Sequence, residues 1–460
     1  MPDNINTNEQ LKHKITNKHK LLIVADDPRG FSGVANQCRH ICIRLAKQNN
    51  EVIVVGVTNL QQLQPPSRVK LPTGEEIKIV QSNRFDDMGL ILKLMKEEKP
   101  DCLVLFTDPH KFSNIWINAS FIREKIPVYF VHVWDTHLVP DDTGTAHYNL
   151  PIYECCDGIG CISKQTEWFV NKVYSKAVYT KTPYIHYVGH GSDKNIYKPL
   201  PPEAYVDVRN NLFGGKQYDF VAMMLNRNQG RKKFSDLIEA WKLFTQSLPK
   251  EQADKCALVL HTEQVADVGT NLLEVAKALA PSTNIYFSAE KYPEEVINQV
   301  YNIADVVLNI SNAEGFGLSA NEAALAGKCT ILNATGGLVD QIGFFDNGIP
   351  IQWTKENYNN LASFQHGIWA YPIYGQRTII GSPHTPYLYD YNASIDEVVK
   401  GLQYWYDVPK EERNCRGLLN RQFALDTGLN STDFSINVEA GIKKTIADFK
   451  PVDLFHLYKI

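Results

Sequence analysis

The 460-residue sequence has no uninterrupted apolar stretch of about 18 residues, the length that a membrane-spanning helix needs. It also lacks a strong excess of charge of either sign, because 47 basic and 51 acidic side chains give a net charge of only -4. The bulk charge therefore does not point to nucleic acid, although it leaves room for a local basic patch. The N-terminus is polar through Lys20 and does not resemble a secretory signal. These absences predict a cytoplasmic protein without a transmembrane segment.

No metal or disulfide pattern stands out among the nine cysteines, which are scattered and odd in number. Reduced, mostly buried thiols are the simplest interpretation of such a distribution in a chain of this size. The tightest group is Cys155, Cys156 and Cys161, but no histidine or second cysteine pair follows at the spacing of a metal site. The sequence therefore predicts no metal site.

Apolar runs alternate with helical patterns along almost the whole chain. A length of 460 residues suggests two domains. Alternation of strands and helices is typical of an α/β fold whose parallel sheet is covered on both faces. We expect strands at 20–25, 52–57, 102–106, 128–133, 158–162, 219–225, 257–260, 285–287, 306–310 and 329–332, with helices at 34–47, 293–304, 396–407, 409–424 and 434–449.

The most informative stretch runs from Ser311 to Ala323 and follows an apolar run at 304–310. Its first acid, Glu314, stands where a buried strand gives way to a helix. The backbone N–H groups of Gly315, Phe316, Gly317 and Leu318 would there favour a phosphate, since glycine permits close approach to the main chain. Glu322 follows eight residues later, so both carboxylates can reach one ligand at the strand's carboxyl end. The alternative is a surface helix with two solvated glutamates.

This stretch, Ser-x-x-Glu-Gly-Phe-Gly-(x)4-Glu-Ala with Gly336-Gly337 behind it, resembles the signature of retaining glycosyltransferases of family 4, the glycosyl transferases group 1. The resemblance implies the GT-B architecture, in which two Rossmann-like domains face each other across a cleft. It also implies that Glu314 contacts the donor sugar and Glu322 the nucleotide ribose. The residues that it places around the donor are Gly315, Phe316, Gly317, Leu318, Gly336 and Gly337.

A basic loop, Asn226 to Lys233, follows the predicted strand at 219–225. Arginine and lysine after a strand can hold a diphosphate, but a solvated loop could be equally basic. The resemblance favours the first interpretation, because the family's Arg-(x)4-Lys is matched by Arg227 and Lys232, with Asn228 beside them at the donor. Lys233 stands where the family commonly has glycine.

Two further candidates lie in the N-terminal half. Gly30 and Gly33 form a Gly-x-x-Gly between a strand and a helix, which alone is a weak signal. The resemblance places such a loop against the donor phosphates or the acceptor. His132 ends the predicted strand at 128–133, and the resemblance implies a position near the transferred sugar, with His137 as second choice. A histidine bonded structurally within its loop is the alternative.

The predicted domain boundaries are a basic polar tail at 1–19, an N-terminal acceptor-side domain at 20–200 and a nucleotide-sugar domain at 201–434. A C-terminal helix at 435–460 is expected to cross back to the first domain. An aromatic-rich insertion near 354–393 would form a small core of its own or stack against an acceptor. The boundary rests on the segment 189–199, which resembles the family's domain crossing, and on the prolines after it.

The resemblance thus predicts transfer of a sugar from a nucleotide donor to a hydroxyl group with retention of configuration. A UDP-sugar is the first choice of donor and a GDP-sugar the second, with no other cofactor. The sequence contains no Asp-x-Asp, the usual divalent-ion carrier of the other large glycosyltransferase class, which favours metal-free chemistry. The acceptor stays open between a glycan, a protein and a hydroxylated DNA base, as does the oligomeric state. A non-catalytic module that binds a nucleotide or a glycan is the alternative function.

Overall fold

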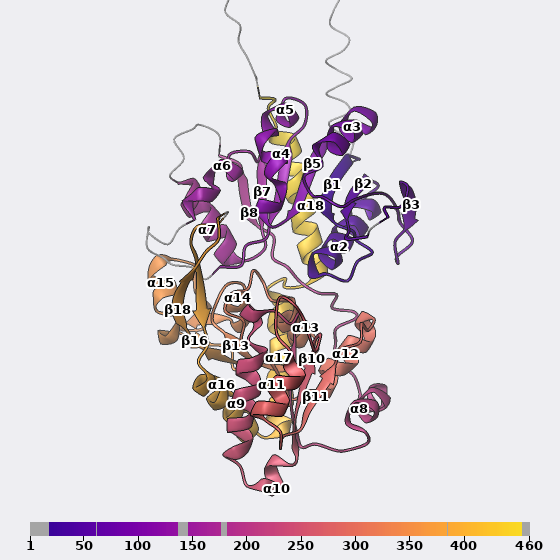
Figure 1. The fold of residues 1–460 in the computed structure, drawn as a ribbon. Helices are drawn as coiled ribbons and strands as arrows, with labels where there is room; N and C mark the ends of the chain where they lie inside the picture. The colour runs from indigo at the N-terminus through magenta and orange to yellow at the C-terminus, as the bar shows by residue number, and fades with distance from the viewer. Residues whose placement is uncertain (1–17, 61, 137–145, 176–181, 384, 453–460) are drawn as a thin grey trace, which may run out of the picture. The chain divides into compact units, whose positions relative to one another are not determined.

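The computed structural model describes residues 18–60, 62–136, 146–175, 182–383 and 385–452. The chain divides into two compact units (Figure 1). Unit 1 comprises residues 1–134, 146–189 and 431–460, and unit 2 comprises 135–145 and 190–430. The main boundary therefore falls after Gly189, eleven residues before the predicted 200/201. The C-terminal segment that counts with unit 1 begins at Ser431, four residues before the predicted start at residue 435.

Unit 1 is built on an eight-stranded sheet with the order β3-β4-β2-β1-β5-β6-β7-β8. All neighbouring strands are parallel except β3, which pairs antiparallel with β4. The inner strands are continuous apolar runs, as expected when helices cover both faces of a sheet. The strands are β1 (Lys20–Asp26), β2 (Glu51–Val57), β3 (Ser67–Lys70), β4 (Glu76–Ser82), β5 (Cys102–Thr107), β6 (Val128–His132), β7 (Gly158–Cys161) and β8 (Tyr184–Tyr187).

The last helix of the described chain, α18 (Ser431–Asp448), packs on this sheet. Phe434 lies 6.5 Å from Phe106 between ring centroids, and Glu439 accepts a hydrogen bond from Arg44 of α2 (Gly33–Lys47). Gly441 leaves no room for a side chain, because an added Cβ would lie 2.3 Å from His186. The other helices of unit 1 are α3 (Met88–Glu98), α4 (Ser113–Ile117), α5 (Ala119–Arg123), α6 (Leu150–Tyr153) and α7 (Lys164–Tyr174).

Unit 2 contains a six-stranded, all-parallel sheet with the order β11-β10-β9-β12-β13-β17. Its strands are β9 (Phe220–Leu225), β10 (Cys256–His261), β11 (Ile285–Ser288), β12 (Val306–Asn309), β13 (Cys329–Asn333) and β17 (Ala370–Ile373). Its helices of eight residues or more are α8 (Val206–Phe213), α9 (Phe234–Gln246), α11 (Leu272–Leu279), α12 (Glu294–Ile303), α13 (Leu318–Leu325), α16 (Ile395–Asp407) and α17 (Lys410–Asp426).

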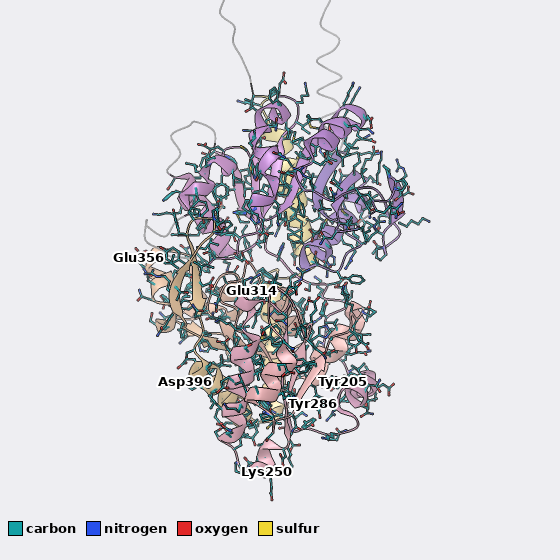
Figure 2. The ribbon with its side chains drawn as sticks, viewed as in Figure 1. Tyr205, Lys250, Tyr286, Glu314, Glu356 and Asp396 are labelled. Carbon is teal, nitrogen blue, oxygen red and sulfur yellow. The ribbon has the colours of Figure 1, made fainter. Side chains whose placement is uncertain are left out.

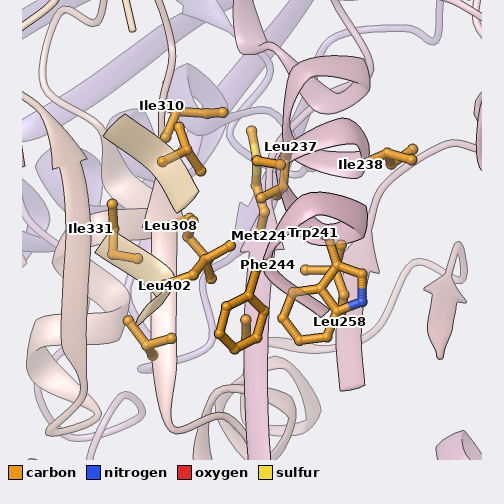
Figure 3. Packing of buried hydrophobic residues seen from close by; sticks show 14 of the residues in the cluster. Met224, Leu237, Ile238, Trp241, Phe244, Leu258, Leu308, Ile310, Ile331 and Leu402 are labelled. Atoms are coloured by element: carbon orange, nitrogen blue, oxygen red, sulfur yellow. The ribbon is translucent and has the colours of Figure 1, made fainter. Parts of the chain in front are cut away.

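The core of unit 2 lies between this sheet and helices α9 and α16. Trp241 and Phe244 of α9 are fully buried against Leu308 of β12, Ile331 of β13 and Leu402 of α16 (Figure 3). Within the described residues, no helix is both long and apolar enough to cross a bilayer.

The aromatic-rich segment at 354–393 is only partly an insertion. Its strand β17 pairs in parallel with β13, from Thr330 opposite Ala370 to Asn333 opposite Ile373, and so completes the sheet of unit 2. The sequence Ala-Tyr-Pro-Ile hid this strand, because proline and only four residues give a weak strand signal. The remainder includes α15 (Lys355–Asn359) and a hairpin of β18 (Gln376–Ile380) and β19 (Leu388–Asn392).

Replacement of Trp241 by alanine tests this core. We expect Trp241→Ala to lower the free energy of unfolding by about 3–5 kcal/mol, because a fully buried aromatic side chain leaves a cavity. Denaturant titration followed by circular dichroism measures the loss. Leu273→Ala on α11, where the side chain is exposed, is the control and should change stability by less than about 0.5 kcal/mol. Equal losses in the two variants would contradict this packing.

Candidate active site

The loop between β12 and α13, residues 310–317, is called the Glu314 loop below. It follows Asn309, the last residue of β12, and ends at Gly317, whose φ of 89° lies in the left-handed region. Glu314 is labelled in Figure 2. The structure thus places Glu314 at the carboxyl end of a central parallel strand, the position that the sequence predicted and where open α/β sheets bind ligands.

The carboxylate of Glu314 is buried in a network of donors. Its Oε1 accepts hydrogen bonds from Lys232 Nζ, from Asn309 Nδ2 at 3.1 Å and from Ser311 Oγ at 3.0 Å. Its Oε2 lies 3.7 Å from Arg231 Nη1. Burial alone would raise the pKa of Glu314, but the cations of Lys232 and Arg231 outweigh it and lower the pKa to about 2. Glu314 is therefore ionised at any working pH.

Both cations come from the short 3-10 turn Gly230–Lys232 that follows β9. Lys232 is buried, and desolvation lowers its pKa despite the nearby Glu314 carboxylate. Within the described residues, Glu314 is the only hydrogen-bond partner of Lys232 Nζ, so two of the three N–H groups on Nζ are free for a ligand. Lys233 has a φ of 64°, which explains why glycine is common there in the family that the motif resembles.

Arg227 and Arg231 differ in their surroundings. The side chain of Arg227 is exposed, and it has no ion pair or hydrogen bond with the part of the chain that the structure describes. Arg231 Nη1 donates to the carbonyl oxygen of Ala313 at 2.6 Å, and its Nη2 lies 3.0 Å from Asp135. The sequence pattern assigned Arg231 no role within the basic loop 226–233. Its position directly before the buried Lys232 is the signal that could have identified it.

The backbone of the Glu314 loop offers unused donors. Gly315, Phe316 and Gly317 are buried, yet their N–H groups find no hydrogen-bond acceptor among the described residues. Buried backbone donors are nearly always paired, so such a group of free amides indicates a ligand position. The side chain of Gln341 binds two carbonyl oxygens of the same loop. Its Nε2 donates to Phe316 O at 2.6 Å and to Gly317 O at 3.2 Å.

Gly336 and Gly337 lie directly against this loop. A Cβ on Gly336 would come within 1.8 Å of the Glu314 carbonyl oxygen, and one on Gly337 within 2.4 Å of Phe316 Cα. Gly337 N–H donates to the same Glu314 carbonyl at 3.1 Å. The close backbone approach that the sequence predicted for these two glycines is present, and it fixes the main chain behind Glu314.

Glu322 lies inside α13, and its carboxylate is buried. Tyr301 donates its hydroxyl to Oε2 at 2.8 Å, and Ser192 Oγ lies 3.4 Å from Oε1. Burial raises the pKa of Glu322 from 4.5 to about 8, and the negative charge of Glu294 adds to the rise. Glu322 is thus mostly neutral near pH 7, unlike Glu314.

The side chain of Asn228 is bonded to the loop that contains Glu263 and Thr270. Its Nδ2 donates to the carbonyl oxygens of Glu263 and Thr270 at 3.1 and 2.7 Å, and its Oδ1 accepts from Thr270 N at 3.2 Å. These contacts occupy both amide atoms. The structure therefore shows Asn228 holding the neighbouring loop, and its contact with a donor stays a prediction.

The candidates of the N-terminal half lie in unit 1. His132 is fully buried, its Nε2 lies 2.8 Å from the Tyr153 hydroxyl, and burial lowers its pKa to about 3. The hydrogen-bond partner of His132 thus belongs to α6 and not to the loop that follows β6. Gly30 lies between β1 and α2 and donates its N–H to Asp27 O at 2.8 Å, and Gly33 is the first residue of α2. Their place at a donor, like that of His132, stays a prediction, and His137 lies outside the described residues.

All nine cysteines are free, seven of them buried, with Cys415 exposed and Cys155 half-buried. Among the described residues, no group of three or more histidines, cysteines, aspartates or glutamates could hold a metal ion.

Residues 213–361 match the family model described as Glycosyl transferases group 1. Mannosylfructose-phosphate synthase of Agrobacterium fabrum is 26% identical over 169 residues, which span 36% of each chain. The match thus covers about a third of the length of that relative.

Solved structures match almost the whole chain. Sucrose-phosphate synthase of Thermosynechococcus elongatus superposes with a TM-score of 0.65 at 12% identity, over 93% of this chain and 99% of that one. The alpha,alpha-trehalose 6-phosphate synthase of Burkholderia multivorans gives 0.63 at 12%, over 94% and 99%. HepE of Anabaena in complex with UDP-glucose gives 0.60 at 15%, over 93% and 99%.

This chain has the GT-B fold. The resemblance to group 1 glycosyltransferases that the Glu314 motif indicated is confirmed, and the matched region contains Glu314, Glu322, Lys232 and the glycine pair. In this GT-B protein Lys232, Gly336 and Gly337 lie against the Glu314 loop.

Replacement of Gly336 by alanine tests the backbone contact. Its φ of 56° and the 1.8 Å approach to the Glu314 carbonyl oxygen both oppose a side chain. We expect Gly336→Ala to lower the free energy of unfolding by about 1–3 kcal/mol. Gly214→Ala, at a φ of 59° with nothing within 4 Å, shares only the backbone strain. Equal losses by denaturant titration would show that the contact behind Glu314 contributes nothing.

The high pKa of Glu322 predicts a pH dependence of stability. The folded protein holds a proton on Glu322 between its ordinary pKa of 4.5 and about 8, which the unfolded chain does not, so stability falls as pH rises through this window. Glu322→Gln removes the effect. Its stability relative to wild type should rise from about pH 5 to about pH 8 and then level off. The exposed Glu274→Gln serves as control. A difference that is flat with pH would contradict the assignment.

Proposed function

We propose that this protein transfers a sugar from a nucleotide-sugar donor to a hydroxyl acceptor, with retention of the anomeric configuration. The observation that carries the proposal is the cluster in unit 2. It combines a buried ionised carboxylate on Glu314, a lysine with free N–H groups at Lys232, and three unpaired backbone amides at Gly315, Phe316 and Gly317.

These groups suit the two ends of a nucleotide sugar. Phosphate oxygens are the natural acceptors for the amides and for Lys232, and negative charge that develops on the leaving diphosphate would meet donors already in place. The Glu314 carboxylate accepts hydrogen bonds and so suits sugar hydroxyls. Proton transfer to a diphosphate oxygen would make an enzymic base unnecessary in a retaining reaction.

A UDP-sugar is the first donor to test, and UDP-glucose in particular, because the similar structure of HepE is in complex with UDP-glucose. A GDP-sugar is the second. For the acceptor, phosphorylated sugars come first. The names of the similar synthases from Agrobacterium, Thermosynechococcus and Burkholderia describe products that carry a sugar phosphate. Glycans, proteins and hydroxylated DNA bases follow.

The test is nucleotide release from a panel of nucleotide sugars in the presence of hexose phosphates. We expect release with wild type and a fall in kcat of about 10²–10³-fold in Lys232→Ala, the size of loss seen when a preorganised donor is removed. Glu314→Gln should show a large loss as well, because it replaces the charged partner of Lys232. Lys242→Ala on α9, a lysine whose ion pair with Glu239 lies outside this cluster, is the control and should retain activity.

Comparison of Arg227→Ala with Arg231→Ala shows which arginine serves the donor. A larger loss in Arg231→Ala is expected from its contact with the Glu314 loop. Unchanged kcat in both Glu314→Gln and Lys232→Ala would overturn the site assignment. Nucleotide binding by calorimetry without release on any acceptor would favour the non-catalytic binding module instead.

A further inference from the structure

The hairpin of β18 and β19 touches the Glu314 loop two residues before Glu314. Asn312 Nδ2 donates to Asp390 Oδ2 at 3.2 Å, and Tyr391 N–H donates to the Asn312 carbonyl oxygen at 2.8 Å. Asn312 and Asp390 are both buried. A strand of the aromatic-rich segment is thus bonded to the loop through one backbone and one side-chain contact.

A second path joins the same two segments. Asn333, the last residue of β13, donates through Nδ2 to the carbonyl oxygens of Ser311, at 2.9 Å, and Tyr391. Asn333 is fully buried. The side-chain amide of Asn333 therefore bonds both the Glu314 loop and the hairpin to the carboxyl end of β13.

The turn that carries the cations belongs to the same network. Asn312 N–H donates to the carbonyl oxygen of Arg231 at 2.9 Å, while Arg231 returns a hydrogen bond to Ala313. Asn312 is thus the residue at which the hairpin, the cationic turn and the Glu314 loop meet. A shift of Asn312 would change the distance between Glu314 and Lys232, the two groups proposed to face the donor.

We infer that Asp390 and Asn312 are positioning residues, through which the β18–β19 hairpin sets the geometry of the Glu314 loop in the transfer reaction. This inference rests on the proposed function. It assigns the aromatic-rich segment a part in the donor site of unit 2, beyond a small core of its own. A buried hydrogen-bond network that joins three segments suits this task, because it has few alternative arrangements.

The expected signature is a loss in kcat with little change in donor affinity. Asp390→Ala should lower kcat for UDP-glucose about 10- to 100-fold, since small displacements of reacting groups cost this much, while KM changes less than about threefold. Asp390→Asn keeps an acceptor oxygen for Asn312 and should recover most of the rate. The double variant Asp390→Ala with Asn312→Ala should be no slower than the slower single variant, because the two residues act through one contact.

A matched control lies on the same hairpin. Asn392 Nδ2 donates to Thr378 Oγ1 at 2.6 Å, a hydrogen bond that stays within the hairpin, and Thr378 is opposite Asp390 in the strand register. Thr378→Val should therefore leave kcat within about twofold of wild type. An equal loss in Thr378→Val and Asp390→Ala would reduce the hairpin to a general stabilising role and overturn the inference.

Amide hydrogen exchange tests the positioning contact without relying on sugar transfer, so its result can be separated from the proposed function. Peptides covering 311–317 should exchange faster in Asp390→Ala than in wild type, and at the wild-type rate in Thr378→Val, whatever the donor. If wild type turns over no nucleotide sugar, the proposed function fails, but faster exchange still supports the positioning contact. Unchanged exchange together with unchanged kcat in Asp390→Ala overturns it.

Discussion

The buried ion pair of Glu314 and Lys232 is the interaction on which the candidate site in unit 2 depends. Two charges removed from water are stable only when further groups satisfy them. Asn309, Ser311 and Arg231 do so for the carboxylate, while Lys232 keeps N–H groups free. This asymmetry matters for the chemistry, because among the described residues the hydrogen bonds of Glu314 go to Oε1, while Lys232 keeps N–H groups for a further anion.

The loop that carries Glu314 is held by backbone contacts on several sides. Gly336 and Gly337 pack against its main chain, Gln341 binds its carbonyl oxygens, and Asn312 connects it with the hairpin. All these contacts use the carbonyl side or the flanks of the loop. The amides of Gly315 to Gly317 are thereby left without acceptors among the described residues, which is the arrangement that an anion site requires.

The two motif glutamates show how neighbouring charges give opposite charge states to two buried residues of the same type. Burial opposes the ionised form of both, but Glu314 lies beside the cations of Lys232 and Arg231 and stays ionised, whereas burial and the negative charge of Glu294 raise the pKa of Glu322. Sequence spacing could predict that both carboxylates belong to one region. It could not predict their ionisation, because the charges that act on them, those of Lys232 and Arg231 on Glu314 and that of Glu294 on Glu322, are distant along the chain.

The sequence by itself determined the α/β class, most strands and the Glu314 motif, since apolar periodicity and glycine spacing are local properties. Only the tertiary structure decided that Arg231 touches the Glu314 loop, that Asn228 is bonded to its neighbouring loop, and that β17 completes the sheet. The boundary after Gly189 belongs to this second group as well. Each depends on contacts between residues far apart in the chain, and no local pattern of residue types specifies which partners such contacts bring together.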